Sequence, residues 1–134
     1  MGRRIRVILL DTHAWLWWVA NEASLSARAA AEISSAASIG IPTVACMEVA
    51  ALAQRGRIDL AQEIGSWIAK ALSQDRVEAV PLTSQIAVRA GSFGDEFVGD
   101  PADRIIYASA IVTDSRLVTR DRFLRRFDPT RTVW

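Results

Sequence analysis

Three acidic side chains stand where solvated surface charges are unusual. Asp11 directly follows the β-branched, apolar stretch 5–10, and Asp121 follows the apolar stretch 117–119. Both carboxylates therefore lie at the carboxyl end of a predicted strand, where parallel α/β sheets place ligand sites. Glu48 belongs to an otherwise apolar helical segment and shares a face with apolar residues. Because a buried, unpaired carboxylate is costly, these positions predict a positive partner nearby.

A fourth acid must be separated from its neighbour. Pro101 suits the first position of a helix, so Asp100 is well placed as the N-cap residue. Asp103 is then the third residue of that helix, where the positive end of the helix dipole favours a carboxylate. Its side chain is shorter than that of the glutamate of a usual capping box, so we expect it not to be used in capping. We assign Asp100 to structure and Asp103 to the site.

Carboxylates that gather at one edge of a sheet repel one another, and a hard divalent cation relieves that repulsion. Mg²⁺ prefers oxygen ligands, usually a few carboxylates with retained waters and substrate phosphates. Such an ion can lower the pKa of a bound water and orient that water for attack on a phosphodiester. We therefore predict one site, both catalytic and metal-binding, formed by Asp11, Glu48, Asp103 and Asp121, with Asp100 as a candidate further ligand. The alternative is that each acid is an independent cap or surface group.

The elements that must position these residues alternate along the chain. Short apolar strands are predicted over residues 5–10, 39–42, 77–80 and 116–119, with 132–133 as a candidate short edge. Helices are predicted over residues 12–19, from Ser24 or Ser26 to 37, over 43–55 with Thr43 as the cap, and over 60–72, 84–90 and 100–113. Strands separated by helices indicate a mostly parallel central sheet, so we predict a single α/β domain over residues 1–134, a three-layer α/β/α sandwich.

Composition narrows the class of protein. Apolar residues make up 51% of the 134, which is enough for a core without disulfides, and the net charge of +1 gives no overall field for nucleic acids or membranes. Cys46 is the only cysteine, which excludes an intramolecular disulfide and favours a reducing cytoplasm. No apolar run approaches the length that spans a bilayer. We expect a cytoplasmic protein without a membrane partner.

Four ordered segments of the chain resemble one family. They are Leu9–Ala14, Thr43–Glu48, Asp100–Ala108 and Leu117–Phe123. Each motif is weak alone, but the ordered set, which spans nearly the whole chain, is similar to the PIN-domain ribonucleases. The closest similarity is to the VapC-type toxins of bacterial toxin–antitoxin pairs.

This resemblance implies a function. The family's four acids fall on Asp11, Glu48, Asp103 and Asp121. The implied activity is Mg²⁺- or Mn²⁺-dependent endonucleolytic cleavage of single-stranded RNA regions, with a metal-activated water as the nucleophile and no histidine or lysine base. The implied partners are the RNA substrate, a cognate VapB-type antitoxin that silences the toxin, and a second copy of the chain in a homodimer.

Other polar residues adjoin the acids. Arg104, Arg120 and Arg122 lie beside Asp103 or Asp121, where guanidinium groups could clamp RNA phosphates. The alternative is that the arginines in the last third of the chain form ion pairs with Asp114, Asp121 and Asp128. Thr12 and Thr119, each next to a site acid, could hydrogen-bond a carboxylate or a metal-bound water; ordinary cap and strand-end roles are the alternative.

An aromatic group follows the first acid. His13 is the sole histidine, and a packing role at the helix start is favoured over acid–base catalysis. Trp15, Trp17 and Trp18 cannot all be core residues, because adjacent helical positions point in different directions. We expect at least one of them to reach the surface. The family resemblance implies that it contacts a second copy of the chain or lines a groove for the VapB-type antitoxin. The alternative is that it stacks on an RNA base.

Two other functions are compatible with parts of this pattern. A non-catalytic RNA- or protein-binding module on the same PIN-like fold is the main alternative, and the complete set of four acids argues against it. A phosphatase that works through a sheet-end aspartate, of the haloacid-dehalogenase type, requires a second aspartate two residues after the first. This chain has His13 at that position, so we set that class aside.

Overall fold

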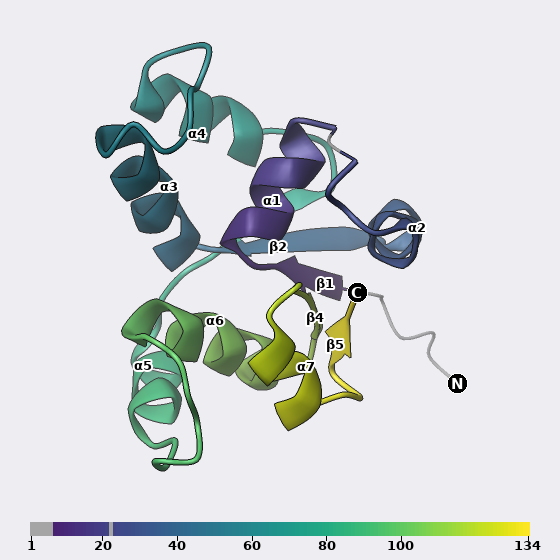
Figure 1. The fold of residues 1–134 in the computed structure, drawn as a ribbon, viewed down its shortest axis with the longest axis vertical. Helices are drawn as coiled ribbons and strands as arrows, with labels where there is room; N and C mark the ends of the chain where they lie inside the picture. Colours follow the sequence, from purple (N-terminus) through teal and green to yellow (C-terminus); the bar gives the residue numbers. More distant parts are fainter. Residues whose placement is uncertain (1–6, 22) are drawn as a thin grey trace.

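The computed structural model describes residues 7–21 and 23–134, and its centre is a parallel sheet (Figure 1). The order of the strands is β3-β2-β1-β4-β5, and every neighbouring pair is parallel. Their bounds are β1 Val7–Leu10, β2 Ser38–Pro42, β3 Val77–Val80, β4 Arg116–Val118 and β5 Thr132–Val133. The predicted strands are confirmed, including the short edge, although the first two residues of the predicted stretch 5–10 lie outside the described residues.

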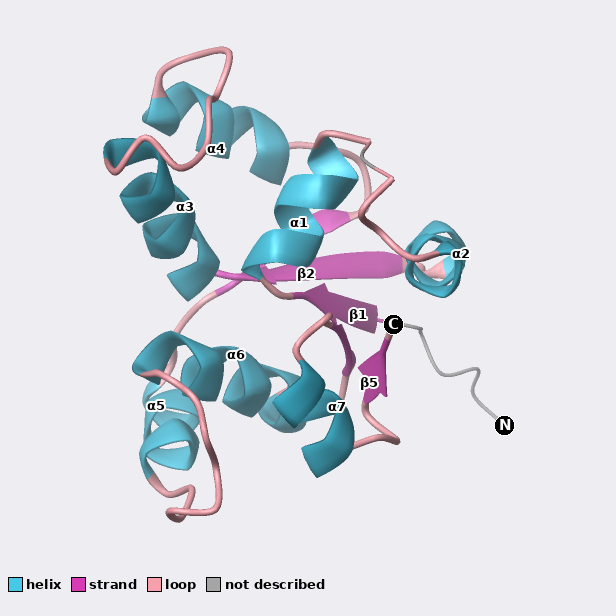
Figure 2. Ribbon diagram, in the orientation of Figure 1, coloured by secondary structure: helices cyan, strands magenta, loops and turns pink. Residues whose placement is uncertain are grey.

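Helices cover both faces of this sheet (Figure 2). On one face lie α1 Thr12–Val19, α3 Val44–Gln54 and α4 Ile64–Leu72, with α2 Ala27–Ser35 at the side. On the other face lie α5 Ser84–Gly91, α6 Pro101–Val112 and α7 Arg122–Phe127. The predicted three-layer α/β/α sandwich is therefore confirmed. No helix in the described ranges is both long and apolar enough to cross a membrane.

The central strand β1 shows why two cores form. Ile8 and Leu10 pack into the core beneath α1–α4, whereas Leu9 packs into the core beneath α6 and α7. Successive side chains of a strand point to opposite faces, so an all-apolar strand covered on both sides serves two cores at once. This alternation leaves Asp11, one residue beyond the strand, at the rim between the two layers.

The helix starts agree with the predictions only in part. Of the two candidate serines, Ser26 caps α2. Thr43 makes no side-chain cap bond because its backbone is already helical, so its predicted capping role is wrong. The helix predicted from residue 60 begins at Ile64, because the Glu63 carboxylate accepts the first free N–H groups. Helix α5 begins at Ser84 as predicted, and the Thr83 hydroxyl caps it by accepting from the Ile86 N–H.

Helix α7 was not predicted. Its sequence Arg-Phe-Leu-Arg-Arg-Phe is short and rich in arginine, so it carries little helical periodicity. Asp121 starts it by accepting a hydrogen bond from the Leu124 N–H at 2.9 Å, and the Leu124 side chain is buried against α6. The helix forms through tertiary packing and a cap, which a sequence pattern of six residues does not reveal.

Candidate metal-binding and catalytic site

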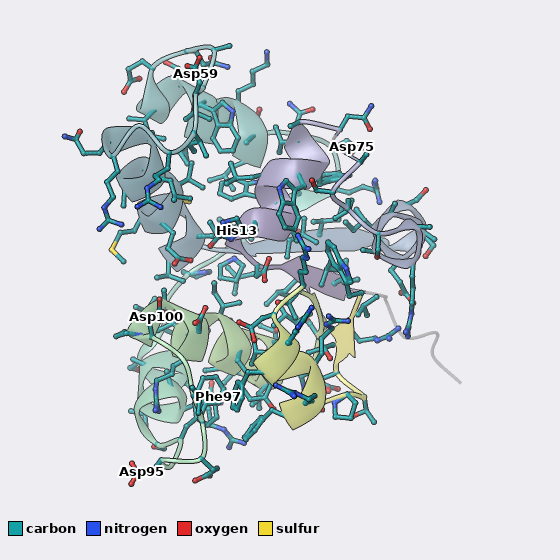
Figure 3. The ribbon with its side chains drawn as sticks, viewed as in Figure 1. His13, Asp59, Asp75, Asp95, Phe97 and Asp100 are labelled. Carbon is teal, nitrogen blue, oxygen red and sulfur yellow. The ribbon has the colours of Figure 1, made fainter. Side chains whose placement is uncertain are left out.

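A cleft of about 520 Å³ opens where the carboxyl ends of β1 and β4 meet the first turns of α1 and α6. In Figure 3, the labelled His13 and Asp100 mark the two helix starts that border it. The residues that line this cleft are Asp11, Thr12, His13, Trp17, Glu48, Asp100, Asp103, Ile106, Arg120 and Asp121. The structure thus brings all four predicted acids into one cleft, together with Asp100.

Asp11 and Asp121 lie next to each other because β1 pairs with β4. Asp11 is the N-cap of α1, with Oδ1 accepting from the Ala14 N–H at 2.9 Å, and Asp121 caps α7 in the same way. The buried Thr119 links them: its hydroxyl oxygen accepts from the Asp121 N–H at 3.1 Å, and its side chain hydrogen-bonds the Asp11 carboxylate. Capping therefore holds both carboxylates at the rim of the sheet.

Glu48 is held by the first residue of α1. It lies one turn into α3, and its Oε1 accepts a short hydrogen bond from the hydroxyl of the buried Thr12. Because Thr12 follows Asp11 directly, this bond keeps Glu48 close to that acid. The two threonines beside the site acids thus each contact a carboxylate.

Asp100 and Asp103 form a reciprocal capping box at the start of α6. The Asp103 N–H donates to Asp100 Oδ1 at 2.8 Å, and the Asp100 N–H donates to Asp103 Oδ2 at 3.3 Å. The expectation that Asp103 takes no part in capping is therefore wrong. An aspartate at this position does reach back, although the second bond is the longer of the two. Asp103 still lines the cleft while it caps the helix.

The acids of the cleft disfavour one another's charge. Burial raises the pKa of Asp103 to about 6, and the negative charges of Asp100, Asp121 and Glu48 add to the shift. Burial also raises the pKa of Asp11, against hydrogen bonds from Thr119 and Ala14 and the nearby His13. The ion pairs found among the described residues include none of the four predicted acids. The cleft therefore holds concentrated negative charge with no paired cation from the described chain.

This donor set suits a hydrated divalent cation. In the described ranges, no three His, Cys, Asp or Glu side chains already stand in an arrangement that would hold an ion by themselves. Mg²⁺ does not require such a cage, since it keeps several waters and binds through one or two carboxylates plus substrate oxygens. The cleft offers space for that hydration and carboxylate oxygens on several sides of it. The residues present therefore fit Mg²⁺ or Mn²⁺ held partly through water.

The three predicted substrate arginines have different surroundings. Arg104 is turned away from the cleft: it donates to the carbonyl oxygens of Phe93 at 3.2 Å and Phe97 at 3.0 Å, and so holds the loop before α6. Arg120 is exposed and lines the cleft. Arg122, at the first position of α7, is exposed but does not line it. Only Arg120 is placed to meet a ligand in the cleft.

The three tryptophans that follow Asp11 also have different surroundings. Trp15 is fully buried, and Trp18 packs partly against the same core. Trp17 lines the cleft, with its ring 5.6 Å from that of the exposed His13. Trp134, which was not among the predicted site residues, lies 5.7 Å from Trp17 between ring centroids. No local sequence signal connects Trp134 to this cleft, because only the pairing of β4 with β5 brings the end of the chain here.

Known proteins are similar to this chain in sequence and in fold. Residues 8–128 match the PIN domain family. The chain is 40% identical over 129 residues to Ribonuclease VapC22 of Mycobacterium tuberculosis, which covers 95% of this chain and 98% of that protein. Two solved structures are similar in fold. VapBC2 from Rickettsia felis bound to a promoter DNA fragment matches with a TM-score of 0.67 and 16% identity, over 94% of this chain and 96% of that one. VapBC-1 from nontypeable Haemophilus influenzae matches with a TM-score of 0.66 and 17% identity, over 94% of this chain and 96% of that one. The chain is therefore a member of the PIN-domain family, of the VapC type.

Proposed function

We propose that this protein is a divalent-metal-dependent endoribonuclease, the toxin component of a type II toxin–antitoxin pair. One observation carries the proposal: four carboxylates from four separate segments meet in one cleft, where the pKa of Asp103 is raised to about 6 and the pKa of Asp11 is also raised. The 40% identity to a protein named as a ribonuclease supports the same conclusion.

Asp11, Glu48, Asp103 and Asp121 would hold Mg²⁺ or Mn²⁺. When bound, the ion supplies a water of lowered pKa and neutralises negative charge on the scissile phosphate. The protein contributes positioning: the Thr12 hydroxyl fixes Glu48, and Thr119 fixes the Asp11 carboxylate. Both threonines are buried, so these hydrogen bonds hold the carboxylates in place in the absence of substrate.

The charge of the cleft also determines how RNA can enter it. An acidic cleft repels phosphates until a cation neutralises the carboxylates. The exposed Arg120 lies next to Asp121 and offers a planar guanidinium to a phosphate oxygen. We therefore assign substrate contact to Arg120 and leave out Arg104, whose N–H groups are already bonded to backbone carbonyls.

We also propose the partners and setting. Solved structures of similar fold are of VapBC pairs, which supports a cognate VapB-type antitoxin for this chain as well. We propose a homodimer of single PIN-like domains, each formed by residues 1–134, acting in the cytoplasm. Co-expression with the product of a small reading frame adjacent to this gene, followed by co-purification, tests the antitoxin.

The decisive experiment compares the wild-type protein with Asp11→Asn on total RNA, with Mg²⁺ and with EDTA. Asparagine is as good an N-cap as aspartate, so the variant keeps the start of α1 while losing the charge. We expect cleavage to fall by about 100-fold or more, because several kcal/mol of metal-dependent stabilisation are lost. The matched control is Asp59→Asn, an exposed acid that Figure 3 shows beside α4, far from the labelled Asp100; it should cleave like the wild type.

Two outcomes would contradict the proposal. Cleavage that survives EDTA, or that Asp11→Asn performs at the wild-type rate, excludes the metal mechanism. A wild-type protein that binds RNA without cutting it under any divalent metal would support the alternative, a non-catalytic binding module on the PIN fold.

A further inference from the structure

We propose that Trp17 and Arg120 form a stacking platform that receives one unpaired RNA base beside the carboxylates. The inference rests on the proposed function, since it identifies how the substrate of that same site is positioned. Trp17 comes from α1 and Arg120 from the connection between β4 and α7, and both line the acidic cleft.

The first argument is the packing of Trp17. Trp15 belongs to the buried core, and Trp18 and Trp134 pack partly against it. Trp17 belongs to none of the apolar clusters that the described residues form, although it is half-buried. A large indole ring with that environment contributes little to the core, and partly exposed tryptophan is typical of contact surfaces.

The second argument is the surroundings of the Trp17 ring. His13 and Trp134 touch it at tilted angles, 45° and 55° between ring planes, so neither covers its face in parallel. The Arg120 guanidinium carbon lies 5.9 Å from the ring centroid, at the outer limit of a cation–π contact, and this side chain is exposed. Neither aromatic neighbour therefore stacks flat on the indole, and the group that lies over its ring is an exposed arginine at the outer limit of contact.

The third argument is position. Trp17 and His13 are four residues apart on α1, whose N-cap is Asp11, and Arg120 directly precedes Asp121. A group stacked on Trp17 therefore lies in the same cleft as the acids that would bind the scissile phosphate. The nucleotide next to the cleaved bond is the part of RNA that reaches this place.

The chemistry of this pair selects an unpaired base. Single-stranded nucleic acids bind through aromatic rings on which bases stack, and arginine planes take part in the same stacks. A base inside a duplex has both faces covered by its neighbours, so it cannot enter between Trp17 and Arg120 without being unstacked. The platform would therefore favour cleavage next to flexible, single-stranded nucleotides.

Binding is tested in an Asp11→Asn background, which keeps the RNA intact and removes one repelling charge. The probe is a short fluorescent oligoadenylate in Mg²⁺, measured by anisotropy. We expect Trp17→Ala to weaken binding by roughly 5- to 100-fold, and Trp17→Phe to restore most of the affinity, because a phenyl ring still stacks. Arg120→Ala should weaken binding more than Arg57→Ala, a matched loss of one exposed arginine outside the cleft.

An abasic scan separates stacking from a general packing effect. In each oligoadenylate of the series, one base is removed at a different position. We expect one position at which base removal weakens binding to the Trp17-containing protein. At that position, base removal should cause no further loss in Trp17→Ala.

Each result decides the proposal. Equal affinity of Trp17→Ala and its parent would overturn the platform and leave this surface to a protein partner. An equal abasic penalty with and without Trp17 would overturn it too, as would a Trp17→Phe variant that folds, by its thermal midpoint, but binds no better than Trp17→Ala. If wild-type protein still cuts RNA in Mg²⁺ and not in EDTA, these failures leave the proposed function standing.

Discussion

The two rims of the sheet carry the same kinds of charge in opposite arrangements. At the amino ends of the strands, cations are paired: Arg116 contacts Glu32 at 2.9 Å, and Arg131 contacts Asp128 at 3.6 Å. Arg76, just before β3, donates to backbone carbonyls at the end of α2. At the carboxyl ends, four acids share a cleft without an ion pair from the described residues.

The two rims therefore contribute differently: the paired charges stabilise the fold, and the unpaired carboxylates are available to a ligand. A paired guanidinium satisfies carbonyl and carboxylate groups that would otherwise be left without partners, so it stabilises the fold. Unpaired carboxylates do the opposite, because their mutual repulsion raises the free energy of the folded state until a cation binds. Parallel α/β proteins place ligand sites at the carboxyl ends of their strands, and the charges of this chain follow that division.

The largest effect on stability should come from the amino-terminal rim. Arg131 donates to the carbonyl oxygens of Ser115 at 2.9 Å and Ala110 at 3.3 Å, and lies 3.7 Å from Asp114. We expect Arg131→Met to lower the free energy of unfolding by about 2–3 kcal/mol, because several partners lose their donor together. Urea denaturation measures this loss, and RNA cleavage per folded molecule should be unchanged. A loss of cleavage without a loss of stability would break the comparison.

A smaller effect should come from Asp103, whose negative charge destabilises the folded protein. Its folded pKa of about 6 lies above its unfolded value near 3.9, so between these values the folded protein holds a proton that the unfolded chain has lost. Stability from this group is therefore present at low pH and lost as pH rises through about 6. For metal-free protein, with solvent screening taken into account, we expect a loss of roughly 1 kcal/mol towards pH 7.

Denaturation in EDTA at pH 5 and pH 7 measures that loss. Asp103→Asn should show a smaller decrease between the two pH values than wild type, whereas Asp59→Asn should keep the wild-type decrease. Addition of Mg²⁺ at pH 7 should recover stability in the wild type. An identical pH profile for Asp103→Asn and the wild type would contradict the repulsion that distinguishes this rim.

The smallest effect should separate the neighbouring acids of α6. Asp100 accepts the Asp103 N–H as an N-cap, and asparagine caps equally well. We therefore expect Asp100→Asn to change stability by only a few tenths of a kcal/mol and cleavage by less than about tenfold, while Asp100→Ala lowers stability by about 1 kcal/mol. A loss of cleavage in Asp100→Asn as large as in Asp103→Asn would instead make Asp100 a metal ligand.

Local patterns in the sequence were sufficient for most of the elements. Apolar runs and caps predicted four strands and six helices near their observed bounds, because strand alternation and helix capping depend on residues close in the chain. The errors fell where local signals compete. Thr43 did not cap α3, and α7 depended on packing against α6.

The four acids could be selected before the fold was known, because each broke a local pattern by ending a strand, starting a helix or interrupting an apolar face. Their meeting in one cleft is a tertiary result, since only the pairing of β1 with β4 brings Asp11 beside Asp121. The directions of long side chains were likewise decided by the fold. Arg104 turned to backbone carbonyls while Arg120 faced the cleft, and their sequence positions beside an acid are alike.

The tryptophans show the same division between what the sequence predicts and what tertiary packing decides. Periodicity alone required that Trp15, Trp17 and Trp18 not all be buried, since adjacent helical positions diverge. Which of them faces the acids depended on how α1 lies on the sheet. The sequence by itself determined the kinds of groups available and the local backbone that carries them. Long-range packing decided which of these groups meet, because contacts between distant segments leave no periodic trace in the chain.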